Sequence, residues 1–198
     1  MRRHVRKKAA ADRPVRFASE EATSLTRAMQ RLWIDHVVWT RQYVIAAVDE
    51  RPEAEVAATR LLKNQDDIGN GIVPFYGKAA GKQLTELLKQ HIMIAVDLVA
   101  AAVAGDEKRF KTFDKKWDKN AEDIAAFLSG ANPNLTKKDV ADILHVHLVL
   151  TKDEAVARIK KDFEKDAAIF DQIVTEILTL SDALSQAIVA QFPAKFAA

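Results

Sequence analysis

The sequence predicts an all-α fold: an antiparallel helical bundle of four to six helices with an internal duplication of helical hairpins. Three observations support this prediction. The 198 residues include only 6 Gly and 5 Pro, and Ala, Leu, Lys and Glu, which favour helix, are abundant. Apolar residues recur at spacings of three and four, and no segment shows the alternation of a strand. A polar pattern also occurs twice, 56 residues apart, which is typical of repeated helical units.

Start and stop signals divide the chain into helices. The start signals are Ser19 before two Glu, Pro52, Asp106, and the capping sequences that begin at Thr136 and Thr151. The stop signals are Pro74, Gly105, Ser129-Gly130 and Pro193. We therefore predict helices over about 20–49, 52–73, 80–104, 107–128, 137–149 and 152–192. Because the predicted loops are short, successive helices should be antiparallel neighbours.

The charge is unevenly distributed along the chain. Residues 1–17 contain seven Lys or Arg and one Asp, a net charge of about +6, although the whole chain carries +2. We interpret this segment as a disordered tail, followed by one helical-bundle domain over 18–198. The alternative is an arm that contacts nucleic acid, an acidic partner or a membrane surface. The remaining sequence has no basic face with interleaved aromatic residues, so nucleic-acid binding is not favoured.

Composition also limits the class of protein. There is no Cys, which excludes disulfides, thiolate nucleophiles and zinc–thiolate sites. The basic segment lacks the apolar region of a secretory signal, and we expect a cytoplasmic protein. No apolar run approaches the ~20 residues that span a bilayer, so no membrane span is predicted. Association of the chain with a second copy of itself is left open.

The repeated pattern places polar residues within apolar helix faces. Asn64-x-x-Asp67 is followed by His91, 27 residues after Asn64, and Asn120-x-x-Asp123 is followed by His147 at the same spacing. When each helix is read along its apolar face, a polar residue interrupts all six faces. These residues are His36, Asn64, His91, Asn120, His147 and Asp166. An unsatisfied polar residue in a core costs about 1–3 kcal/mol, so a recurring set indicates that its members satisfy one another or share a ligand.

Three hypotheses follow from this set. The leading one is a protein that binds a metal ion or a small polar ligand, because imidazole and carboxylate groups suit Zn, Fe or Mn. Its candidate metal ligands are His36, His91, His147, Asp67, Asp123 and Asp166, with Asn64, Asn120 and Glu176 as partners behind them. The second hypothesis is a structural or interaction protein whose polar residues set helix register. The third is a metal-dependent or acid–base enzyme. The chain lacks the Glu-x-x-His motif of di-iron bundles.

A wider combination of motifs resembles a group of small bacterial all-α proteins with no established activity. The motifs are Asn64-Gln65-x-Asp67-Ile68-Gly69-Asn70, Pro74-x-Tyr76-Gly77, His91-Ile92 and Asn132-Pro133-Asn134. The resemblance covers about residues 30–196 and implies a helical bundle, without implying a reaction. Members of that group carry further His near positions 174–176, where this chain has Val174, Thr175 and Glu176.

Overall fold

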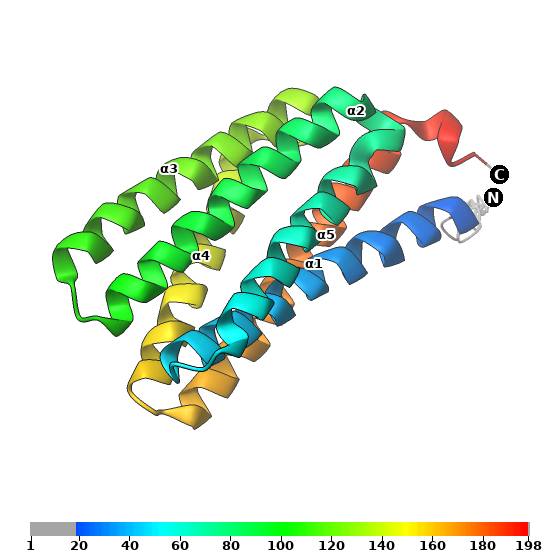
Figure 1. Cartoon of the computed structure of the whole chain (residues 1–198). Coiled ribbons are helices and arrows are strands. Elements are labelled where there is room, and N and C mark those ends of the chain that lie inside the picture. Colours follow the sequence, from blue (N-terminus) through cyan, green and yellow to red (C-terminus); the bar gives the residue numbers. More distant parts are fainter. Residues whose placement is uncertain (1–18, 198) are drawn as a thin grey trace, which may run out of the picture.

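The computed structural model describes residues 19–197, and within this range it is an all-α bundle without strands (Figure 1). The α-helices are α1 (Glu20–Val48), α2 (Glu53–Val103), α3 (Glu107–Ala131), α4 (Lys137–Ile159) and α5 (Phe163–Gln191), followed by the short 3-10 helix η1 (Pro193–Lys195). The predicted fold class is confirmed. The basic segment 1–17 lies outside the described residues.

Helix α2 is bent back on itself and acts as two antiparallel arms (Figure 1). Gly77 has φ 82° and ψ 169°, a conformation that is essentially restricted to glycine. Beyond it the arms touch: a Cβ on Gly69 would lie 2.6 Å from the carbonyl oxygen of Gly81. In a straight helix these two residues would be roughly 18 Å apart. The prediction that the helix stops at Pro74 is wrong by three residues, since the reversal occurs at Gly77.

The helices pack side by side around one main core, and the last helix, α5, packs against the first, α1. Helix α1 packs on α2 and on α5, and α3 packs between α2 and α4. Large apolar side chains from every helix meet inside, including Met29, Ile68, Leu84, Ile124, Leu148 and Ile177. With α2 counted as two arms, the bundle consists of three consecutive helical hairpins. Hairpin 1 is α1 with the first arm of α2, hairpin 2 is the second arm with α3, and hairpin 3 is α4 with α5.

Most helix starts agree with the sequence signals. The side chain of Ser19 accepts a hydrogen bond from the amide of Ala22, and Asp106 and Thr136 cap α3 and α4 in the same way. The predicted start at Thr151 is wrong. Thr151 lies inside α4 and donates its hydroxyl to the carbonyl of His147 at 2.8 Å, a bond available to Thr within a helix. The chain turns instead at Lys161, whose φ is 59°, and Asp162 caps α5.

A polar network ties the chain together at the end where α2 reverses. The hydroxyl of Tyr76 donates to Gln191 and accepts from the side-chain amide of Asn132, both at 2.8 Å. Asn132 in turn accepts from the backbone amide of Asn134 at 2.8 Å. Tyr76, Asn132 and Asn134 belong to motifs singled out in the sequence, and their contacts join the ends of α2, α3 and α5.

Within residues 19–197, α5 is the one helix whose length and composition would allow it to cross a membrane. Its apolar residues Ile169, Ile173, Ile177, Leu180 and Leu184 belong to the main core. The core helix of a bundle passes the same test of length and composition, so this finding is weak evidence of a span.

Candidate functional site: a histidine pocket

The same side-chain contact occurs once in each hairpin. His36 on α1 contacts Gln65, His91 on α2 contacts Asn120, and His147 on α4 contacts Glu176. In each pair the histidine uses Nδ1, and its partner lies 29 residues later on the other helix of the hairpin. The distances are 3.4, 2.8 and 2.9 Å, respectively. The predicted partners Asn120 and Glu176 therefore do lie behind histidines.

The partners in the three hairpins differ in what else they do. In hairpin 2, Asn120 also donates its amide to the carbonyl of Leu87 at 3.1 Å and so anchors the facing helix. In hairpin 1 these two tasks are divided, because Asn64 donates to the carbonyl of Leu32 at 3.0 Å while Gln65 contacts the histidine. In hairpin 3 the partner Glu176 is a carboxylate, which cannot donate to a backbone carbonyl.

The three imidazole rings converge in the interior of the bundle. The ring centroid of His147 lies 5.6 Å from that of His36 and 6.3 Å from that of His91. Each histidine is only 3% exposed. All three line one pocket, together with Thr40, Thr151 and Trp117 and with apolar side chains of α1, α2 and α4. We call this cavity the histidine pocket.

The histidine pocket is narrow and mostly apolar. Its empty volume is about 470 Å³ when the mouth is included, but the space open to the centre of a water molecule is only about 20 Å³. A cavity of the latter size holds about one water molecule. The pocket reaches the surface beside Val96 and Lys152, which are partly exposed. A ligand would therefore place only a small head group against the imidazoles.

Burial keeps two of these histidines neutral. It lowers the pKa of His91 to about 3, with a further contribution from nearby His147. Burial also lowers the pKa of His36 well below its usual value, and the other two histidines act in the same direction. Neutral imidazole retains one nitrogen lone pair, so these rings can coordinate a metal ion or accept a hydrogen bond near neutral pH.

Two predicted carboxylates lie away from the pocket. The side chain of Asp67 is 37% exposed and pairs with Lys63, and that of Asp123 is 46% exposed and pairs with Lys119. The prediction that they share the interior face is therefore wrong. They follow Asn64 and Asn120 by three positions, which rotates them to the edge of the helix. A Lys four residues before each Asp then holds it at the surface.

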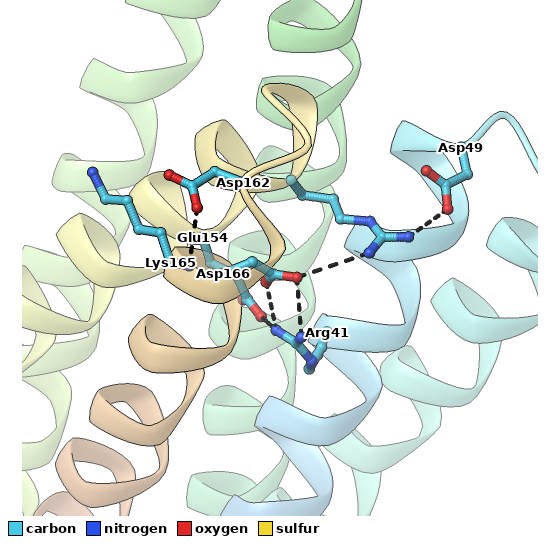
Figure 2. A network of polar contacts seen from close by, with 7 residues as sticks. Arg41, Asp49, Glu154, Asp162, Lys165 and Asp166 are labelled. Carbon is cyan, nitrogen blue, oxygen red and sulfur yellow. Dashed lines mark hydrogen bonds and ion pairs between the residues drawn. The ribbon is translucent and has the colours of Figure 1, made fainter.

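Asp166 is buried as predicted, but it belongs to a separate ion-pair network (Figure 2). The guanidinium of Arg41 donates to both oxygens of Asp166, at 2.7 and 3.1 Å, and also to Glu154 (Figure 2). Arg158 approaches Asp166 at 3.9 Å and pairs with Asp49 at 2.5 Å. This network joins α1, α4 and α5, and the cations that hold Asp166 take the place that a metal ion would need.

Glu154 is a carboxyl group of this network whose pKa is raised strongly. It is only 2% exposed, and burial raises its pKa to about 7 although the contact with Arg41 acts in the opposite direction. Burial lowers the pKa of Arg41, but the hydrogen bonds to Asp166 and Glu154 outweigh this effect and raise it overall. The network therefore contains a carboxyl group that titrates near neutral pH, and His147 of the histidine pocket acts on its pKa in the same direction as Arg41.

The metal hypothesis fits the pocket only in part. Three imidazoles, two of them backed by Asn120 and Glu176, are a suitable donor set for a divalent transition metal. Among residues 19–197, however, no group of three or more His, Asp or Glu side chains is placed so that it could hold a metal ion. Two imidazoles on one zinc ion would have centroids roughly 5 Å apart, given bonds of ~2.0–2.1 Å. The observed rings would have to move closer together.

Sequence reasoning missed several residues of the pocket. Gln65 was not identified as the partner of His36, although the 29-residue spacing from His91 to Asn120 points to it. Thr40 and Thr151, one turn after His36 and His147, also line the pocket. Trp117 lines it too, and its ring centroid lies 5.0 Å from that of His91. The spacing of four from His36 and His147 could have identified Thr40 and Thr151.

Comparison with known proteins gave no relative. The chain matches no protein-family model, and no significant match was found among curated proteins or solved structures. The geometry of the pocket is therefore the basis for the function proposed below.

Proposed function

We propose that this protein binds one small ligand, a metal ion or a small polar molecule, in the histidine pocket. The observation that carries the proposal is that three buried histidines, one from each hairpin, line one cavity while their Nδ1 atoms are held by other side chains. Nε2 is the ring nitrogen that this arrangement leaves for a ligand. A pocket with apolar walls and a few convergent polar groups is the usual form of a small-ligand site.

For a metal ion, the residues that would hold it are His36, His91 and His147, supported by Asn120 and Glu176. Protein purified without an affinity tag should then contain stoichiometric Zn, Fe or Mn, or should bind added Zn²⁺ or Co²⁺. Chelator should lower the melting temperature, because a ligand that binds the folded state alone stabilises it. In the His91→Phe variant, chelator should no longer change the melting temperature. In Asp67→Asn, a change at an exposed position, chelator should lower the melting temperature as it does in the unchanged protein.

For a small polar molecule, the measurement is a shift in melting temperature across a panel of small amines, alcohols, amides and carboxylic acids. A hit should be abolished by His91→Phe and retained by Asp67→Asn. If neither a metal ion nor any member of the panel binds at the pocket, the proposal fails.

A second candidate is a structural protein in which the polar residues only set helix register. The observation that favours it is that Asn64 and Asn120 anchor the backbone carbonyls of facing helices in addition to any contact with a histidine. Buried polar pairs are known to fix register at some cost in stability. In this case His91→Leu and His147→Leu should leave the fold intact or more stable, and no ligand should depend on either residue. Loss of a measured ligand in these variants would favour the first candidate.

A further inference from the structure

The hydrogen bonds around the pocket determine which imidazole nitrogen carries the proton. The amide nitrogen of Asn120 donates to the carbonyl of Leu87, so its oxygen faces Nδ1 of His91 at 2.8 Å. Since that oxygen can only accept, Nδ1 of His91 carries the hydrogen. The same reasoning applies to His147, whose Nδ1 lies 2.9 Å from a carboxylate oxygen of Glu176. Nε2 is therefore the nitrogen that presents a lone pair in the neutral form of each of these two rings.

His36 has the opposite arrangement. The amide nitrogen of Gln65 donates to the carbonyl of Leu61 at 2.7 Å and to the side-chain oxygen of Asn64 at 3.2 Å. The two hydrogens of this amide nitrogen therefore point to those oxygens, and the nitrogen, which cannot accept a hydrogen bond, faces Nδ1 of His36 at 3.4 Å. A hydrogen on Nδ1 would have no acceptor there, so in the neutral ring of His36 the hydrogen lies on Nε2. The three histidines thus offer the pocket two acceptors and one donor.

The hydroxyl groups of the pocket increase the excess of acceptors. Thr40 donates its hydrogen to the carbonyl of His36, and Thr151 donates to that of His147, both at 2.8 Å. Each hydroxyl therefore has only lone pairs left for a ligand. Other donors also line the wall. Nε1 of Trp117 is buried and has no partner within residues 19–197. The hydroxyl of Tyr43 donates to the carbonyl of Val96 at 3.4 Å, and Lys152 carries an ammonium group.

Building on the proposed function, we propose that the ligand of the histidine pocket is a small neutral primary amine. A neutral R–NH₂ group has two N–H donors and one lone pair. Its N–H groups would donate to Nε2 of His91 and Nε2 of His147, and its lone pair would accept from Nε2–H of His36. No carboxylate side chain among residues 19–197 lines the pocket.

The size and polarity of the pocket agree with this ligand class. The space beside the imidazoles admits a group about as large as water, which an amino group matches, and the apolar walls toward the mouth suit a short alkyl chain. The ammonium form is disfavoured because it would lose its hydration inside the bundle, where no carboxylate among residues 19–197 lines the pocket to pair with it. The ammonium group of Lys152 on the wall is already paired with Asp114 at 2.6 Å.

The test uses 2,2,2-trifluoroethylamine with the full chain, because its fluorines keep the amine neutral near neutral pH and provide a ¹⁹F signal. We expect saturable ¹⁹F shifts, together with ¹⁵N shifts at Nε2 of His91 and Nε2 of His147. The N,N-dimethyl derivative has no N–H group and should not bind. The ¹⁹F shifts should disappear in His91→Phe and persist in Asp67→Asn, and melting curves of both variants show that they are folded.

Two results would overturn this inference while the proposed function stands. One is binding of the dimethyl derivative as tight as that of the parent amine. The other is stoichiometric Zn²⁺ on all three histidines, with the proton of His36 moved to Nδ1 and no binding of the amine. If neither the amines, Zn²⁺ nor the wider panel bind, both the inference and the proposed function are wrong.

Discussion

Nδ1 of His147 lies 2.9 Å from a carboxylate oxygen of Glu176, 29 residues further along the chain. The separation is the same as from His36 to Gln65 and from His91 to Asn120. A helical hairpin of constant length thus brings a histidine to the same kind of partner three times. The partner is a side-chain amide in the first two hairpins and a carboxylate in the third.

The first prediction concerns tautomers. Long-range ¹⁵N–¹H spectra of the imidazoles near pH 7.5 should show His91 protonated at Nδ1 and His36 protonated at Nε2, because Asn120 presents an oxygen and Gln65 presents a nitrogen. Exposed His145 serves as an internal reference for an imidazole in solvent. A hydrogen on Nε2 of His91 would contradict the orientation of Asn120.

The second prediction concerns the dependence of stability on pH. The pKa values of His36 and His91 are lowered in the folded state. From about pH 6.5 down to about 3, the unfolded chain therefore binds protons that the folded chain does not. Each histidine then costs up to ~1.4 kcal/mol per pH unit as the pH falls. Burial raises the pKa of Glu154 to about 7, so between about pH 7 and 4.5 its folded form gains a proton and opposes this loss.

Urea denaturation between pH 4 and 8 measures this balance. The free energy of unfolding should fall as the solution becomes more acidic, with a shallower slope in His91→Leu. In Glu154→Gln the slope between pH 7 and 4.5 should be steeper than in the native protein, because the opposing contribution is gone. Equal slopes in all three proteins would show that these groups do not control the pH dependence.

The fold was predictable because its signals are local, whereas much of the site was not. Ser19, Asp106 and Thr136 lie beside the amides that they cap, so a short window of sequence contains the whole interaction. Asp166 could not be placed in this way, because its partner Arg41 is 125 residues away. The turn at Lys161 was missed because neither Gly nor Pro marks it, while Thr151 offered a false start signal inside α4.

The third prediction concerns Asn120. Replacing Asn120 with Ala removes both the acceptor for His91 and the donor to the carbonyl of Leu87. Leaving these buried groups unsatisfied should lower the free energy of unfolding by about 1–3 kcal/mol. The neighbouring change Lys119→Ala breaks only an exposed ion pair with Asp123. It should change the free energy of unfolding by less than about 1 kcal/mol. Chemical denaturation of both variants checks the comparison, and similar losses would contradict the role of Asn120.

The fourth prediction concerns the reversal of α2. Gly77 has φ 82° and ψ 169°, which a side chain disfavours, so Gly77→Ala should destabilise the protein by about 1–3 kcal/mol. Gly130 is a suitable control because it lies within α3 and an added Cβ would meet nothing within 4 Å. Gly130→Ala should be neutral or slightly stabilising. The melting temperature should therefore fall in Gly77→Ala and stay the same or rise slightly in Gly130→Ala. Equal changes in melting temperature would contradict the strain at Gly77.

The ion pairs of Arg41 have a consequence for the order of folding. Each histidine contact closes a loop of 29 residues, whereas Arg41 reaches Glu154 across 113 residues and Asp166 across 125. Short loops close at lower entropic cost than long ones, so we expect the three hairpins to form early and the first to dock onto the last at the end. The Arg41→Met variant should then unfold faster while its refolding rate changes little. The pocket, which takes one histidine from each hairpin, would be completed only in that final docking step.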